Sequence, residues 1–245
     1  MSVAVLYDIH GNLPALEAVL AEIGERDVDR MVVGGDVMPG PMPRETLARL
    51  LDVDVPIQFI RGNGEREVLG LREGREPQGL PPAVVDVLRW VAEELTETEA
   101  EILRSWPPTL ELEVDGLGEI FFCHGTPRSD TEIFTRVTPE ASILPLFRDV
   151  TAGLAVCGHT HMQFDREVGA VRVVNAGSVG MPFGEPGAYW LELGPGVQLR
   201  KTDYDLASAA ERIRNTGYPQ AEEFASREVL RPRSELEVLK MFESA

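Results

Sequence analysis

The chain has few cysteines and no long apolar run, and both shortages exclude whole classes of protein. Its 245 residues contain two cysteines, Cys123 and Cys157, which cannot form a disulfide framework and which we interpret as buried apolar thiols. No apolar run approaches the ~18 residues that a membrane span needs, and the N-terminus shows no cationic leader followed by an apolar stretch. We therefore predict a cytoplasmic protein with no membrane segment.

Positive charge is also scarce. The chain carries 23 lysines and arginines against 41 aspartates and glutamates, for a net charge of −18. A field of this sign repels a polyanion, so nucleic acid is disfavoured as a partner. The hydrophobic fraction of 43% is that of a globular protein, and a chain of this length can bury a core without disulfides or metals as staples. We predict one domain over residues 1–245.

Strand-like and helix-like patterns alternate in the first part of the chain. The apolar run from Val3 to Tyr7 is typical of a buried strand, and the segments Arg30 to Gly35 and Ile57 to Ile60 are also strand-like. The segments between them place apolar residues at helical spacing, as from Leu13 to Ile23. Strand–helix–strand units with short links predict a sheet with parallel strands and flanking helices.

The middle and the end of the chain follow other patterns. Residues 65–108 are predicted to form a helical insertion, in which Thr96 and Glu99 have the spacing of a capping box. Short strands joined by glycine-containing turns follow up to Thr202, and such turns favour antiparallel neighbours. Residues 206–245 are predicted to form a charged helical tail. We expect the insertion and the tail to shape access of the substrate to the site.

Residues that can bind metal ions follow several of the strand-like runs. The chain has four histidines, and all of them lie in such positions, together with two aspartates and an asparagine. The set is Asp8, His10, Asp36, Asn63, His124, His159 and His161. Ligands of α/β sheets bind at the ends of strands, and alternate side chains of an extended segment point the same way, which predicts that the paired ligands converge. A lone histidine is usually structural, but the recurrence of the pattern favours a metal site.

The mixed nitrogen and oxygen donors indicate the type of metal. Imidazoles with carboxylate and amide oxygens suit Mn, Fe, Co, Ni or Zn better than Mg or Ca. The candidates outnumber the ligands of one tetrahedral ion, so we predict two divalent transition-metal ions. Their charge exceeds that of Asp8 and Asp36, which would attract a phosphate group despite the acidic surface.

The order of these motifs, D-x-H, G-D, G-N, H-G and G-H-x-H, resembles the calcineurin-like metallophosphoesterase superfamily. The D-I-H-G-N form and the N-A-G-S-V-G segment at Asn175 to Gly180 are similar to its small bacterial branch, which includes phosphodiesterases and relatives of diadenosine tetraphosphatases. The resemblance implies a four-layer α/β/β/α sandwich of two mixed sheets with flanking helices. It also implies that a hydroxide bridging the two metals hydrolyses a phosphodiester, phosphomonoester or pyrophosphate bond of a small phosphorylated substrate, with nucleotides among the candidates.

The resemblance implies roles for individual residues. One metal would be held by Asp8, His10 and His161, the other by Asn63, His124 and His159, and Asp36 would bridge them. Arg61 matches an arginine that holds a phosphate oxygen in some relatives, and a surface ion pair is an equally good interpretation. Asn12 could contact substrate or cap the helix that starts at Leu13, and we favour the cap. Arg128 could reach the rim of the site.

Two departures from the family pattern bear on function. Gly64 stands where many relatives carry a histidine that assists the leaving group, and Glu65 could replace it only with a raised pKa. The segment after Asp36 also lacks the second aspartate and the arginine of the Ser/Thr phosphatases, which disfavours a phosphoprotein substrate. We predict a metal-dependent phosphoesterase. The alternative is a metal-binding sensor or regulatory protein with weak turnover.

Overall fold

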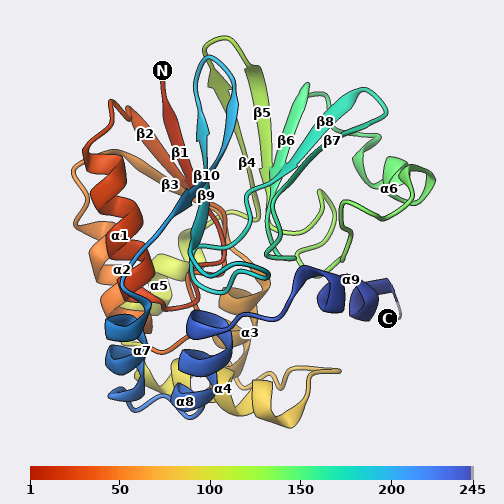
Figure 1. Ribbon diagram of the computed structural model, residues 1–245. Helices are drawn as coiled ribbons and strands as arrows, with labels where there is room; N and C mark the ends of the chain where they lie inside the picture. The colour runs from red at the N-terminus through yellow and green to blue at the C-terminus, as the bar shows by residue number, and fades with distance from the viewer. Residues whose placement is uncertain (244–245) are drawn as a thin grey trace.

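Two five-stranded sheets packed face to face form the centre of the molecule, a computed structural model that describes residues 1–243 (Figure 1). Sheet A has the order β10-β9-β1-β2-β3 and sheet B the order β4-β5-β6-β8-β7. The strands are β1 (Val3–Leu6), β2 (Arg30–Val33), β3 (Ile57–Phe59), β4 (Thr109–Val114), β5 (Gly118–Cys123), β6 (Leu154–Cys157), β7 (Phe164–Val168), β8 (Val171–Asn175), β9 (Ala188–Leu193) and β10 (Val197–Thr202).

Both sheets are mixed, as predicted. In sheet A, β1, β2 and β3 run parallel while β9 and β10 are antiparallel additions. In sheet B, β5, β6 and β8 run parallel while β4 and β7 are the antiparallel edges. The parallel strands of each sheet end at the same edge, and this places the loops that follow them side by side.

Successive side chains of β1, the central strand of sheet A, point to opposite faces of the sheet and contribute to a separate core on each side. Val3, Val5 and Tyr7 pack toward sheet B, whereas Ala4 and Leu6 pack toward the helices. All residues of β1 are buried, which is expected for a strand that has both faces covered and explains its continuous apolar sequence.

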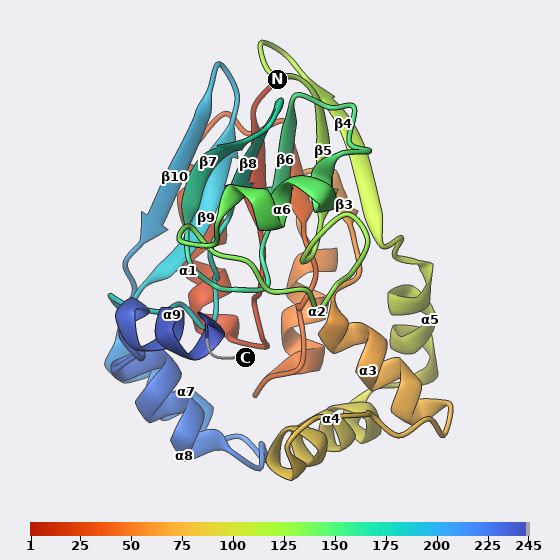
Figure 2. The same cartoon turned by 90° about the vertical axis from the view of Figure 1, so that its right-hand side faces the viewer.

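Helices cover the outer faces of the sheets and close one end of the molecule (Figure 2). Helices α1 (Leu13–Gly24), α2 (Pro43–Leu51) and α5 (Glu97–Ser105) lie on the side of sheet A, and α6 (Glu140–Phe147) packs on sheet B. Helices α3 (Asn63–Arg72), α4 (Pro82–Glu94), α7 (Leu206–Arg214) and α8 (Ala221–Phe224) lie below the carboxyl ends of β1 to β3 in Figure 1. The π-helix η1 (Ala225–Leu230) and α9 (Glu235–Glu243) follow. The predicted four-layer arrangement is confirmed.

The capping box predicted in the middle of the chain is confirmed. Thr96 Oγ1 accepts the N–H of Glu99 at 3.2 Å, and the Glu99 carboxylate accepts the N–H of Thr96 at 2.7 Å, so α5 begins where the sequence indicates. Helices α4, α5 and most of α3 lie within the predicted insertion. The predicted tail of residues 206–245 contains α7, α8, η1 and α9, and its residues 244–245 lie outside the described part. One domain over the whole chain stays a prediction. Within residues 1–243 no helix is both long and apolar enough to cross a membrane.

Two elements are absent from the sequence prediction. Strand β7 has charged residues at its three central positions, and they escape burial because β7 lies at the edge of sheet B. Helix α6 contains Pro145, which argues against a helix from sequence alone. Ile143 and Phe147 of α6 are nevertheless buried against sheet B, so tertiary packing outweighs the local preference.

Candidate metal centre

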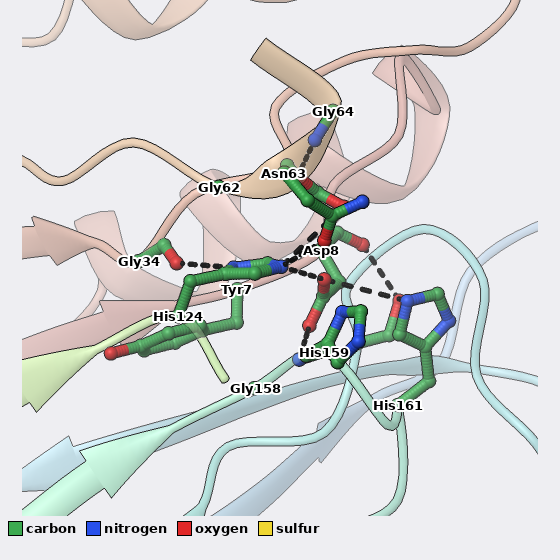
Figure 3. Close-up of polar contacts among 12 residues, drawn as sticks. Tyr7, Asp8, Gly34, Gly62, Asn63, Gly64, His124, Gly158, His159 and His161 are labelled. Carbon is green, nitrogen blue, oxygen red and sulfur yellow. Dashed lines mark hydrogen bonds and ion pairs between the residues drawn. The ribbon is translucent and has the colours of Figure 1, made fainter. Parts of the chain in front are cut away.

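All seven predicted metal ligands meet at the carboxyl ends of the parallel strands, between the two sheets and α3. Sheet A contributes the loops after β1, β2 and β3, and sheet B those after β5 and β6. Figure 3 shows Asp8, Asn63, His124, His159 and His161 pointing toward one another. Residues far apart in the sequence therefore form one cluster, as the strand-end pattern predicts.

The backbone of the ligand loops is not extended. The prediction that the ligand pairs converge because alternate side chains of an extended segment point the same way is therefore wrong in its reason. Five ligands have left-handed backbone angles: Asp8 (φ 53°), His10 (φ 47°), Asp36 (φ 50°), His159 (φ 66°) and His161 (φ 57°). Each such residue costs about 1 kcal/mol or more relative to a right-handed conformation. Backbone hydrogen bonds from Asp8 N to Gly35 O (3.1 Å) and from His10 N to Asp36 O (2.9 Å) hold these turns. The pairs converge because of tight turns, not because of strand alternation.

Asp8, His10 and His161 form the first group of candidate ligands. Asp8 Oδ1 lies 3.8 Å from His10 Nε2 and 3.4 Å from His161 Nε2, and these two nitrogens are 3.1 Å apart. Asp8 Oδ2 accepts the N–H of His159 at 2.8 Å. Asp8 Oδ1, by contrast, is buried and has no hydrogen-bond partner among the described residues. A buried carboxylate oxygen without a donor is costly, and a cation is the partner that fits its surroundings.

Asp36 and His124 form the second group, again with Asp8. Asp36 Oδ2 lies 3.5 Å from His124 Nε2 and 3.8 Å from His10 Nε2. The other Asp36 oxygen accepts the N–H of Gly64 at 2.7 Å, which fixes the orientation of the carboxylate. Asp8 Oδ1 is also 3.8 Å from His124 Nε2. Both carboxylates thus lie between the histidines of the two groups, an arrangement that suits two neighbouring cations; the bridging role of Asp36 stays a prediction.

Three of the histidines are oriented in the same way. In each ring Nδ1 lies at hydrogen-bond distance from a backbone carbonyl: His10 from Pro39 (3.1 Å), His124 from Gly34 (2.9 Å) and His161 from Met181 (2.8 Å). When Nδ1 donates to the carbonyl, Nε2 carries the lone pair and faces the centre. This tautomer is the one that a metal ion requires, and the backbone selects it.

Asn63 and His159 complete the second group. Asn63 Oδ1 lies 3.1 Å from His124 Nε2. With the amide turned over, its nitrogen would donate to His159 Nδ1 at 3.0 Å and to His124 Nε2 at 3.1 Å. The amide oxygen could accept from a protonated His124 or face a cation, whereas the turned amide would donate to the two rings only when both are neutral. Either orientation keeps Asn63 in contact with both histidines.

The charges of the centre act strongly on one another. Burial opposes a charge on His124, but the Asp36 carboxylate outweighs burial and raises the pKa of His124 to about 10. Burial and the positive His124 lower the pKa of His159 to about 4. Burial disfavours ionised Asp36, yet His124 and His10 hold the pKa of this carboxyl below its usual range. A divalent cation binds neutral imidazole, so it would replace the proton on His124.

Glu65 anchors the loops around the centre. Its buried carboxylate accepts three backbone N–H groups, from Asp36 (2.9 Å), Met38 (3.1 Å) and Gly62 (2.8 Å). Burial and the neighbouring Asp36 raise the pKa of Glu65 to about 7, as a leaving-group acid would need. Both oxygens are nevertheless engaged by backbone donors. The geometry therefore makes Glu65 a structural acceptor that joins α3 to the loops after β2 and β3.

Gly64 leaves no room for a side chain. A Cβ at this position would lie 2.2 Å from the carbonyl oxygen of Met38 and 2.6 Å from Pro39 Cδ. Contacts this short require the backbone to move, because the Met38 oxygen belongs to the main chain. The first turn of α3 thus depends on glycine for its close approach to the Met38–Pro39 segment. The histidine of many relatives could not be accommodated here without a backbone shift.

A cavity of about 450 Å³ beside His124 is lined by three arginines, Arg61, Arg66 and Arg128. Arg66 Nε lies 2.6 Å from an oxygen of Asp130, and Arg128 Nε lies 2.9 Å from one of Glu132. Arg61 is half-buried and forms no ion pair within the part of the chain that is described. An unpaired guanidinium next to the centre suits the binding of an anion, and the alternative of a surface ion pair is not observed.

The Asn12 side chain has a structural role at the start of α1. Its Oδ1 accepts the N–H of Ala15 at 3.2 Å, and its Nδ2 donates to the carbonyl of Gly180 at 2.9 Å. The side chain is fully buried. Both ends of the amide are therefore used, and the geometry favours the helix cap over a contact with substrate.

A second cavity, of about 250 Å³, was missed by sequence reasoning. Its lining combines the ligands His10, Asp36 and Asn63 with apolar residues of α4 and with Tyr218. The apolar residues of α4 recur at helical spacing, so from sequence they read as part of the core. No pattern in the sequence distinguishes a cavity wall from a core face.

Comparisons with known proteins agree with this geometry. Residues 1–193 match the family model of the calcineurin-like phosphoesterase superfamily domain. An uncharacterized protein of Methanocaldococcus jannaschii is 26% identical over 238 residues, which cover 89% of this chain and 94% of that protein. The structure of a hypothetical protein from Pyrococcus horikoshii, 24% identical, matches with a TM-score of 0.79 over 95% of this chain and 99% of that one. A metallophosphoesterase from Sphaerobacter thermophilus, 25% identical, matches with a TM-score of 0.71 over 92% and 97%. All seven candidate ligands lie within the matched segment.

Proposed function

Because the chain belongs to the calcineurin-like phosphoesterase superfamily, we propose that it hydrolyses a phosphodiester, phosphomonoester or pyrophosphate bond of a small phosphorylated substrate, such as a nucleotide, in the cytoplasm. The observation that carries the proposal is the environment of Asp8 Oδ1. This buried oxygen has no hydrogen-bond donor among the described residues and lies within 3.8 Å of Nε2 of His10, His124 and His161. Such a set of donors fits divalent transition-metal ions.

The chain's own residues would divide between two ions. Asp8, His10 and His161 would hold one ion, Asn63, His124 and His159 the other, and Asp36 would contact both. When bound, two such ions, chosen from Mn, Fe, Zn, Co and Ni, supply a water of lowered pKa and positive charge for the phosphoryl oxygens. The carbonyls of Gly34, Pro39 and Met181 keep the histidines in the tautomer that this role needs.

Arg61 would position the phosphate. It lines the same cavity as His124, and in the described structure no carboxylate neutralises it. A guanidinium there can donate two hydrogen bonds to non-bridging phosphate oxygens and stabilise the charge that they gain in the transition state. Arg66 and Arg128 are paired with carboxylates, so their charges contribute less.

The leaving oxygen would depart with little help from the protein. Gly64 has no side chain to donate a proton, and the Glu65 oxygens accept backbone N–H groups. Substrates with leaving groups that are already stable anions, such as aryl oxides or the phosphates of a pyrophosphate bond, should therefore react faster than alkyl esters.

A metal-binding protein with weak turnover is the alternative, and the missing acid is the observation that favours it. Hydrolysis of bis(p-nitrophenyl) phosphate by the Mn²⁺-loaded protein separates the two, with Asp36→Asn as the inactive variant and Asp149→Asn, on the exposed surface, as the matched control. We expect Asp36→Asn to lose several orders of magnitude in rate and Asp149→Asn to lose nothing. A loss below about tenfold, equivalent to ~1.4 kcal/mol, would contradict a central role for Asp36. A folded, metal-loaded wild type no faster than Asp36→Asn would establish the alternative.

A further inference from the structure

The 250 Å³ cavity opens onto the metal centre and is otherwise mainly apolar. His10, Asp36 and Asn63 belong both to its lining and to the candidate ligands. Its apolar lining includes Leu80, Val84, Val87, Leu88, Met181 and Tyr218, and Glu67 and Gln220 are the polar residues that line it besides the candidate ligands. A molecule held at the metals by its phosphate can therefore extend into this cavity without leaving the centre.

The two cavities beside the centre differ in charge. The larger one contains Arg61, Arg66 and Arg128, whereas no lysine or arginine of the described residues lines the smaller one. The anionic oxygens of a phosphate are favoured on the arginine side, because a phosphate oxygen buried against apolar walls would lose its hydration without compensation. The apolar cavity can then accept the uncharged part of the substrate whose phosphate lies on the arginine side.

The apolar wall is formed by elements that are distant in the sequence and tied together. Gln220 Nε2 donates to the carbonyl of Ala83 at 2.7 Å, and Trp90 of α4 meets Tyr218 edge to face at a centroid distance of 5.5 Å. Figure 2 shows the loop between α7 and α8 reaching the end of α4 beneath the sheets. Tyr218 and Gln220 lie beyond residue 193, where the family match ends, so the chain's own tail completes this wall.

The rim of the cavity exposes apolar side chains to water. Leu80 is 38% and Val84 is 41% exposed, while Val87 and Leu88 on the same wall are buried. Covering Leu80 and Val84 with an apolar group would remove this surface from water, which is favourable in proportion to the area buried. A dry cavity of ~150 Å³ can hold a benzene molecule, so this volume accommodates a group of at least one ring.

We propose that this cavity binds the apolar organic group of the phosphoester, an aryl group or a ring of similar size, while the phosphate lies at the metal centre. This rests on the proposed function, since it places phosphorus at the metals. The substrate class it implies is an aryl or similarly bulky ester of phosphate, and simple alkyl esters would leave the cavity unfilled.

Non-hydrolysable phosphonates test the assignment by binding alone. Calorimetric titration of the Mn²⁺-loaded protein with methylphosphonate and phenylphosphonate should show at least about tenfold tighter binding of the phenyl compound. Val84→Trp should fill the cavity and bring this ratio toward one. Leu199→Trp, at a position of β10 that is 44% exposed, is the matched control and should keep the wild-type ratio. Both positions are partly exposed, so neither substitution has to displace a buried core side chain.

The outcomes separate this inference from the proposed function. Equal affinity for the two phosphonates, or an equal ratio in Val84→Trp and wild type, would overturn the assignment of the cavity. Turnover of aryl and methyl phosphodiesters is measured on the same preparations. Hydrolysis without any preference for bulky groups would remove only the cavity assignment, whereas tight binding of phenylphosphonate with no hydrolysis of any ester would remove the proposed function and keep the assignment.

Discussion

Gly64 and Met38 approach each other so closely that a Cβ on residue 64 would lie 2.2 Å from the Met38 carbonyl oxygen. The same glycine donates its N–H to Asp36 Oδ1 at 2.7 Å, so the contact also sets the direction of a carboxylate of the centre. The absence of a histidine at this position is therefore a consequence of packing. Introducing one by Gly64→His would move the backbone before it could supply an acid.

The first prediction concerns Gly64→Ala. A single methyl group should lower the free energy of unfolding by ~1–3 kcal/mol, because the Met38 oxygen cannot yield without moving the chain. It should also weaken Mn²⁺ binding, since Asp36 loses its fixed orientation. Gly24→Ala is the control, because a Cβ at Gly24 meets no atom of the described structure within 4 Å. Urea unfolding and metal titration of both variants give the answer, and equal stability of the two would show that the contact is not tight.

The second prediction is that metal binding releases protons. The raised pKa of His124, about 10, keeps this ring protonated at neutral pH in the metal-free protein. A cation needs the neutral ring, so its apparent affinity should rise with pH, by up to about tenfold per unit for each proton released, until the pH passes the pKa of His124. Calorimetry of Mn²⁺ binding between about pH 6 and 8, in buffers of different ionisation enthalpy, counts the protons. An affinity independent of pH would be inconsistent with this coupling.

The third prediction is that Arg61 acts on the phosphate and not on the metals. Arg61→Ala should lower kcat/KM for a phosphodiester by about 10- to 1000-fold while the metal content stays that of the wild type. Arg61→Lys should recover only part of the loss, because an ammonium cannot form the paired hydrogen bonds of a guanidinium. Arg148→Ala, at an exposed arginine that does not line the cavity, should behave as wild type. Unchanged kinetics in Arg61→Ala would exclude the role.

The fourth prediction follows from the missing acid. A positioned acid typically contributes ~10²–10⁴-fold, and neither Gly64 nor Glu65 can supply it. Rates for a series of phosphodiesters with leaving groups of increasing pKa should therefore fall steeply. A flat dependence, with the chemical step shown to be rate-limiting, would mean that another group donates the proton.

The sequence predicts that the seven candidate ligands lie together because they follow strands whose short, mostly apolar runs are easy to recognise. It does not predict how the ligands converge. Asp8 and His10 come together through left-handed turns, and the hydrogen bonds that hold these turns come from the loop after β2, which no local pattern reveals. Asp36 is likewise oriented by Gly64, 28 positions later. Tertiary contacts set the geometry.

The cavity walls could not be predicted for a different reason. Val84 and Leu88 lie one helical turn apart on α4, yet Leu88 is buried in the core and Val84 stands at the rim of a cavity. Helical spacing reports only that both face the interior side of the helix. The cavity wall also includes Tyr218 and Gln220, which contact α4 from the tail of the chain and have no sequence pattern that links them to it.

Two cations bound by the strand-end residues are central to the proposed activity. The direct measurement is a titration of metal-free protein with Mn²⁺, in which bound metal per chain and the rate of bis(p-nitrophenyl) phosphate hydrolysis are determined on the same samples. The rate should increase with bound metal and reach its maximum at about two ions per chain. A folded protein that binds no ion at saturating Mn²⁺ or Zn²⁺, or that binds two and hydrolyses nothing, would contradict the proposed activity.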